Sequence, residues 1–83
     1  MPTREVLPQF WRDWARLTPE QREAFGAVRA GLRVKGVRTA PGIFELTWAP
    51  DGRATFSFGA PVVVGESHVI WRRIGTHDVL RAP

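Results

Sequence analysis

Residues 42–58 constrain the fold most, because they are typical of two strands joined by a tight turn. The turn sequence Pro50-Asp51-Gly52 combines a residue with a fixed φ, a turn-forming acid and a glycine. On both sides of it, apolar and polar residues alternate, which is the pattern of half-buried strands. We therefore expect strands over 43–49 and 53–59, with the rest of the chain packed around this hairpin.

A three-residue loop of Pro50-Asp51-Gly52, with Ala49 opposite Arg53, sorts the hairpin into an apolar and a polar face. In that loop, Gly52 takes the left-handed position. A two-residue loop would mix Arg53 with core residues, since a one-residue slip moves every side chain to the other face. The preferred register predicts an apolar face of Phe44, Leu46, Trp48, Ala54, Phe56 and Phe58. It predicts an open polar face of Ile43, Glu45, Thr47, Arg53, Thr55 and Ser57.

Two short helices are predicted ahead of the hairpin. Residues 8–17 carry an apolar stripe of Phe10, Trp14 and Leu17 at helical spacing. A second helix begins at Thr18, where Thr18 and Gln21 form a capping box and Pro19 suits the first helical position. This helix should run to about residue 30, with Ala24, Phe25 and Val28 facing inward. The two helices should form a hairpin that covers the apolar face of the sheet.

Further strands are indicated over 32–37 and 67–74, while residues 3–7 suit either a short edge strand or an extended lead-in. In the last strand, Val69 and Trp71 should point inward, which places Arg72 on the polar face with Glu45. Residues 75–83 form a short polar tail. The sequence thus predicts one α+β domain over 1–83, with a small antiparallel sheet of three to four strands and an N-terminal helical hairpin packed on one face.

The composition excludes several classes of protein. The 83 residues contain no Cys, and the two His lack the spacing of metal ligands, so we expect no disulfide, metal or other cofactor. No apolar run reaches the roughly 18 residues of a membrane helix, and we expect a cytoplasmic protein with no membrane contact. Twelve basic against eight acidic residues give a net charge of +4, which favours a polyanionic partner such as RNA.

The polar face carries groups suited to RNA cleavage by attack of the 2′-hydroxyl. Such a reaction needs a base, an acid for the leaving oxygen and cations near the phosphate. Glu45 suits the base, His77 suits the acid because it titrates near neutrality, and Arg53 and Arg72 suit charge stabilisation. The alternative is a solvated cluster of ion pairs, with His77 capping a turn. We expect His68 to be structural.

Five short motifs, taken in order, resemble the RelE/ParE toxin superfamily, and most closely its RelE, YoeB and HigB-like ribonuclease branch. They are FWRDWARL at 10–17, LRVKGV at 32–37, PGIFEL at 41–46, DGRA at 51–54 and GTHD at 75–78. The resemblance implies a single toxin domain of a type II toxin–antitoxin pair. Such toxins are metal-independent endoribonucleases that cut mRNA, commonly on the ribosome, and a cognate antitoxin protein neutralises them.

Position by position, the resemblance assigns Glu45 as the base, Arg53 as the arginine after the turn and His77 as the terminal acid. It implies RNA contacts for Arg33 and Lys35. From the last strand we also expect RNA contacts of Arg72 and Arg73, and the sequence leaves open which of the two faces the site. The chain departs from the family in having no Tyr and a shorter second helix. A shorter helix leaves apolar surface of the sheet exposed, and a homodimer or a bound antitoxin helix could cover that surface. The alternatives are a non-catalytic or degenerate module that binds RNA or protein, and the gyrase-inhibiting ParE branch, which Glu45 with His77 argues against.

Overall fold

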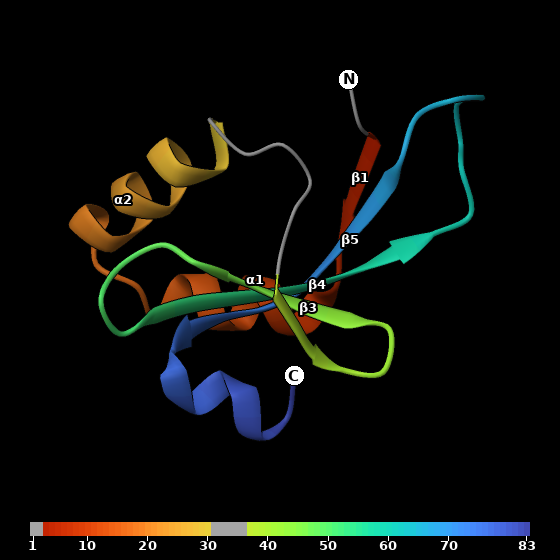
Figure 1. Ribbon diagram of the computed structural model, residues 1–83. Coiled ribbons are helices and arrows are strands. Elements are labelled where there is room, and N and C mark those ends of the chain that lie inside the picture. Colours follow the sequence, from red (N-terminus) through yellow and green to blue (C-terminus); the bar gives the residue numbers. More distant parts are fainter. Residues whose placement is uncertain (1–2, 31–36) are drawn as a thin grey trace.

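A computed structural model describes residues 3–30 and 37–83, and within them two α-helices and a 3₁₀-helix pack on a five-stranded sheet (Figure 1). The helices are α1 (Pro8–Ala15), α2 (Pro19–Ala30) and η1 (His77–Arg81). The strands are β1 (Thr3–Val6), β2 (Val37–Ala40), β3 (Ile43–Thr47), β4 (Gly52–Gly59) and β5 (His68–Thr76). The predicted α+β class is confirmed.

The sheet is mixed, with the strand order β1-β5-β4-β3-β2. Strands β2 to β5 pair antiparallel, whereas β1 pairs parallel with β5, from Thr3 opposite His68 to Val6 opposite Trp71. The predicted antiparallel strands are present as β2 to β5, and the sheet differs from the prediction in having a fifth strand, β1, which is parallel to its neighbour. Strand β1 is a segment of four residues that takes its conformation from the edge of β5 rather than from any strand pattern of its own.

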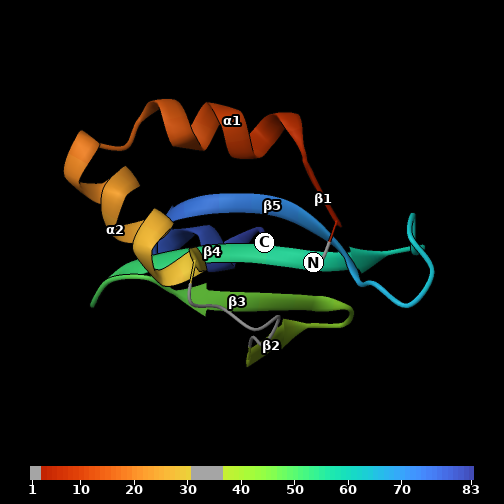
Figure 2. The same cartoon turned by 90° about the horizontal axis from the view of Figure 1, so that it is seen from above.

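The helices lie on different sides of the sheet. In Figure 1, α2 lies above the sheet and η1 below it, and Figure 2 shows α1 running alongside β5. The core between α1, α2 and the sheet is aromatic. Trp71 of β5 is its centre, with ring centroids 5.4 Å from Phe25 and 5.3 Å from Phe56. Its other buried apolar members include Phe10, Leu17, Leu46, Ala54, Val69 and Ile74.

The junction between α1 and α2 forms as the sequence predicts. The Thr18 amide donates to Gln21 Oε1 at 2.8 Å and the Gln21 amide donates to Thr18 Oγ1 at 3.1 Å, which is the expected capping box. Arg22 then donates to the Trp14 carbonyl at 3.1 Å and lies 5.6 Å from the centre of the Trp14 ring. Phe25 is buried as predicted, but Val28 is 36% exposed.

The β3–β4 hairpin has the predicted faces but not the predicted pairing. Arg53 lies opposite Thr47 rather than Ala49, so the strands are displaced by two residues from the expected register. Because side chains alternate with a period of two, a shift of two residues leaves every side chain on its expected face. The turn is closed by the Gly52 amide, which donates to the Ala49 carbonyl at 3.0 Å, with Pro50 and Asp51 at its centre.

Gly52 explains the difference in register. Its φ is not positive, unlike that of Gly42 and Gly65, so it does not occupy the left-handed position expected of a loop glycine. It is a buried strand residue on which the Trp48 indole packs, and a Cβ at this position would lie 2.6 Å from the ring. Glycine is therefore needed here for close approach and not for backbone conformation.

Replacing Gly52 with Ala should lower the free energy of unfolding by about 1–3 kcal/mol, because Trp48 or the strand must move to admit the methyl group. Urea unfolding followed by tryptophan fluorescence measures the change. Gly26→Ala is the matched control: nothing lies within 4 Å of its Cβ position in α2, and it should raise stability by about 0.5–1 kcal/mol. Unchanged stability of Gly52→Ala would contradict the packing of Trp48 on Gly52.

Candidate functional site

The polar face of the sheet carries a row of three side chains in register, one from each of three strands. Glu45 of β3 lies opposite Thr55 of β4, which in turn lies opposite Arg73 of β5. The face is not open over its whole width, as Thr55 is completely buried and its hydroxyl has no hydrogen-bond partner among the described residues. Glu45 is half-buried.

The C-terminal tail covers part of this face. Gly75 lies opposite Arg53, and a Cβ on Gly75 would lie 2.9 Å from Val79 of η1, so Val79 packs on the face that carries Arg53 and Glu45. Val79 is 7% exposed. The tail is thus a packed 3₁₀-helix rather than the polar extension expected from the sequence, and it folds onto the same side of the sheet as Glu45.

His77 begins η1 at the turn end of the hairpin. Thr76 pairs with Gly52, and the His77 amide donates to Asp51 Oδ1 at 3.4 Å. The His77 side chain is exposed. Over residues 3–30 and 37–83, neither the His77 ring nor the Glu45 carboxylate has a hydrogen bond or an ion pair.

Arg53 is held by the turn that precedes it. Its Nη1 donates to the carbonyls of Gly52 at 2.9 Å, Ala49 at 3.3 Å and Pro50 at 3.4 Å. Arg53 is the diagonal neighbour of Glu45 across the hairpin, but its guanidinium turns toward the loop, and no ion pair joins the two in the part of the chain described. Its Nε is buried and has no hydrogen-bond partner among the residues that the structure describes.

A β-bulge at Arg72 changes which arginine of β5 pairs across the sheet. Thr55 pairs with Arg73 and Phe56 with Trp71, which leaves Arg72 as the extra residue. Arg73, rather than Arg72, therefore lies in the row with Glu45. Arg72 Nε donates to the Pro83 carbonyl at 3.1 Å, so the tail occupies it. Arg33 and Lys35 lie outside the described residues.

Asp13 of α1 is an organising residue that was not among the candidate site residues expected from the sequence. Its carboxylate accepts two hydrogen bonds from Arg73, at 2.9 and 3.0 Å, and one from the Ile74 amide at 3.2 Å. Burial alone would raise the pKa of Asp13, but the hydrogen bonds and charge of Arg73 and the Ile74 amide hold this pKa below its ordinary value. The hydrogen bond to Asp13 raises the pKa of Arg73. The sequence did contain a signal for the position of Asp13. It lies three residues after Phe10, and residues at this spacing are neighbours on the surface of a helix.

His68 has the structural role expected of it. It is buried at the start of β5, where Nδ1 lies 2.8 Å from Thr3 Oγ1 and Nε2 lies 2.9 Å from Glu5 Oε1. Both partners belong to β1, so His68 joins the two parallel strands. Among residues 3–30 and 37–83, no three His, Cys, Asp or Glu side chains lie close enough together to hold a metal ion. None of the described helices has the length and apolar character needed to cross a membrane.

Comparisons with protein-family models, with curated proteins and with solved structures found no match to this chain. The resemblance to the RelE/ParE toxins therefore remains a prediction from five sequence motifs. Glu45 lies on the polar face and His77 beside it, while Arg72 and Arg73 are engaged in contacts within the chain.

Replacing Asp13 with Asn should lower the free energy of unfolding by about 3 kcal/mol near neutral pH, because it breaks a largely buried ion pair. The Arg73 side chain is 25% exposed, so we expect a loss of stability at the lower end of the range for broken buried ion pairs. The difference in unfolding free energy between wild type and Asp13→Asn should shrink once the pH falls below about 4, the ordinary pKa of Asp. It should disappear as the pH falls further, through the lower pKa of Asp13 in the folded state. Urea unfolding at several pH values measures both effects.

The control is Asp78→Asn, which removes a carboxylate from an exposed pair with Arg81 at 3.7 Å. It should change the unfolding free energy by less than about 1 kcal/mol at every pH. If the difference between wild type and Asp13→Asn stayed constant into the acid range, ionised Asp13 would not be the stabilising form.

Proposed function

We propose that this chain is the toxin of a type II toxin–antitoxin pair and that it inhibits translation by cleaving mRNA without a metal ion. The observation that carries the proposal is the pair Glu45 and His77. Both side chains lack internal partners in the described residues, and η1 folds the tail that bears His77 onto the side of the sheet that carries Glu45. The motif order that resembles the RelE branch supports the same class.

In the proposed reaction, Glu45 accepts the proton of a ribose 2′-hydroxyl, and the 2′-oxygen attacks the adjacent phosphorus. The bond from phosphorus to the 5′-oxygen breaks, and His77 donates a proton to that leaving oxygen. The products are a 2′,3′-cyclic phosphate and a free 5′-hydroxyl. Arg53 would stabilise the phosphorane charge through Nη2, which has no partner in the described part of the chain, whereas Nη1 binds the turn.

The partners follow from the same proposal. The net charge of +4 suits a polyanionic substrate, and the substrate would be mRNA held on the ribosome in the cytoplasm. Arg33 and Lys35 would add contacts to the RNA backbone. A cognate antitoxin would neutralise the protein until it is released.

Induced expression of the wild type should arrest bacterial growth and produce mRNA fragments. Glu45→Ala and His77→Ala should each reduce cleavage by about 10²–10⁴-fold, the usual contribution of a general acid or base. Primer extension on a reporter mRNA and growth curves measure the two effects. Glu23→Ala, which removes an exposed carboxylate from α2, is the control and should remain toxic. Full toxicity in both site variants would remove the catalytic assignment.

A second candidate is a non-catalytic module that binds RNA or a protein partner. It is favoured by the internal contacts of the arginines: Arg73 binds Asp13, Arg72 binds the C-terminal carbonyl and Arg53 binds the turn. These contacts leave fewer cations for a phosphorane than a ribonuclease of this kind would use.

Binding to a single-stranded RNA separates the two candidates. The non-catalytic module should bind RNA with an affinity that falls steeply as salt rises, and it should leave the RNA intact. Fluorescence anisotropy at several salt concentrations and gel analysis of the same samples, with and without ribosomes, measure binding and cleavage together. Fragments that disappear in Glu45→Ala would contradict the non-catalytic candidate.

A further inference from the structure

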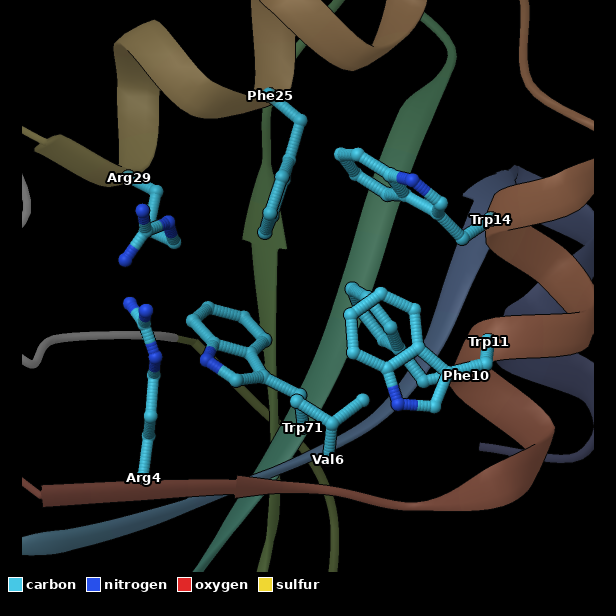
Figure 3. A pocket seen from close by; sticks show the side chains of 8 residues that line it. All are labelled: Arg4, Val6, Phe10, Trp11, Trp14, Phe25, Arg29 and Trp71. Carbon is cyan, nitrogen blue, oxygen red and sulfur yellow. The ribbon is translucent and has the colours of Figure 1, made fainter.

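A pocket of about 220 Å³ opens between α1, α2 and the β1–β5 edge of the sheet (Figure 3). Its walls are mostly aromatic and its mouth carries two arginines. The lining residues are Arg4, Val6, Phe10, Trp11, Trp14, Phe25, Arg29 and Trp71. The pocket lies on the core side of the sheet, whereas Glu45 belongs to the opposite face, so the two sites are distinct.

The two arginines of the pocket face one another. Figure 3 shows the guanidinium groups of Arg4 from β1 and Arg29 from α2 pointing toward each other beside the Trp71 indole. Within residues 3–30 and 37–83, neither has a carboxylate or any other hydrogen-bond partner. Two like charges placed together repel, and a single anion between them would remove the repulsion and gain two charge-assisted contacts. The arrangement is therefore suited to a phosphate, which guanidinium groups bind through paired N–H donors.

The aromatic walls suit a flat ring system. Trp11 is 56% exposed at the rim, although it belongs to a helix that buries its neighbour Phe10. Exposed tryptophan next to unpaired arginine is the combination that stacks on nucleobases in proteins that bind single strands. The volume is below the roughly 300–1,000 Å³ of sites for drug-sized ligands, so the pocket has room for one ring system rather than several.

We infer that this pocket binds one nucleotide of a single-stranded RNA, with the base against the aromatic wall and its phosphate between Arg4 and Arg29. The inference rests on the proposed action on RNA, but it requires no catalysis by Glu45 or His77. The pocket would hold RNA on the side of the sheet away from the cleavage face, and so add affinity without touching the reacting bond.

A second copy of the chain fits this surface less well. A symmetric dimer across the pocket would bring Arg4 and Arg29 close to the same two cations of its partner, since the two halves of a two-fold contact are identical. Four unpaired guanidinium groups in one interface would oppose association. A ligand that carries a phosphate instead brings a negative charge to the guanidinium groups of Arg4 and Arg29, and is attracted to them.

Titration with AMP, adenosine and inorganic phosphate tests the pocket directly. Three of the four Trp line it, so intrinsic fluorescence should report occupancy. AMP should bind at least about tenfold more tightly than adenosine or phosphate alone, because only AMP offers both the ring and the anion. Arg4→Gln with Arg29→Gln should remove this advantage and leave adenosine binding unchanged, whereas Trp11→Ala should weaken AMP and adenosine alike.

The matched control is Arg12→Gln with Arg81→Gln, which removes two charges from exposed positions outside the pocket and should keep the AMP affinity within about twofold. Equal loss in the control and in the Arg4–Arg29 variant would overturn the inference, as would phosphate binding as tightly as AMP. A dimer seen by sedimentation that AMP fails to dissociate would also overturn it. If the protein binds AMP but cleaves no mRNA, the pocket is supported and the ribonuclease proposal is refuted. If it cleaves mRNA but does not bind AMP, the ribonuclease proposal is supported and the pocket is refuted.

Discussion

The carboxylate of Asp13 holds the edge of β5 at the point where β1 ends. Strand β1 pairs with β5 only as far as Trp71, and three residues later the Ile74 amide would have no strand beside it. Asp13 accepts that hydrogen bond and the two bonds of Arg73, so α1 takes the place of a strand along the remaining edge. Because Arg73 also donates to the Ala82 carbonyl, the same contact links α1, β5 and the C-terminal tail. Through the tail, this contact connects α1 to η1, whose Val79 packs on the polar face.

Local signals in the sequence predicted the elements that depend on local physics. The Thr18–Gln21 capping box and the two faces of the β3–β4 hairpin follow from spacing and alternation, and both are confirmed. Features that depend on distant partners could not be predicted. Strand β1 exists because β5 offers it an edge, and the two-residue displacement of the hairpin arises because Trp48 packs on Gly52. No periodicity in the sequence reports either contact.

The candidate site shows the same division. Glu45 could be placed on the polar face because its strand alternates regularly, whereas the bulge after Thr55 placed Arg73 rather than Arg72 beside it. Nothing in this sequence marks the extra residue of the bulge. The side chains that follow it in the strand therefore lie on the opposite face from the one that regular alternation predicts. The aromatic pocket was not predicted from the sequence, because its walls come from two helices and two strands. Of its lining residues, Arg4 lies on the strand that the sequence marked poorly, so the pairing of Arg4 with Arg29 needed the structure.

The parallel pairing of β1 with β5 has a consequence for synthesis of the chain. Thr3 and His68 are 65 residues apart in the sequence, so β1 has no edge to join until the residues of β5 have left the ribosome. Closing so long a loop is slow compared with forming the helical hairpin or the β3–β4 hairpin. The early chain therefore carries its first strand unpaired, and Arg4 reaches Arg29 only when β5 is in place. A protein assembled in this order completes its phosphate pocket in the last step of folding, and a nascent or truncated chain would lack it.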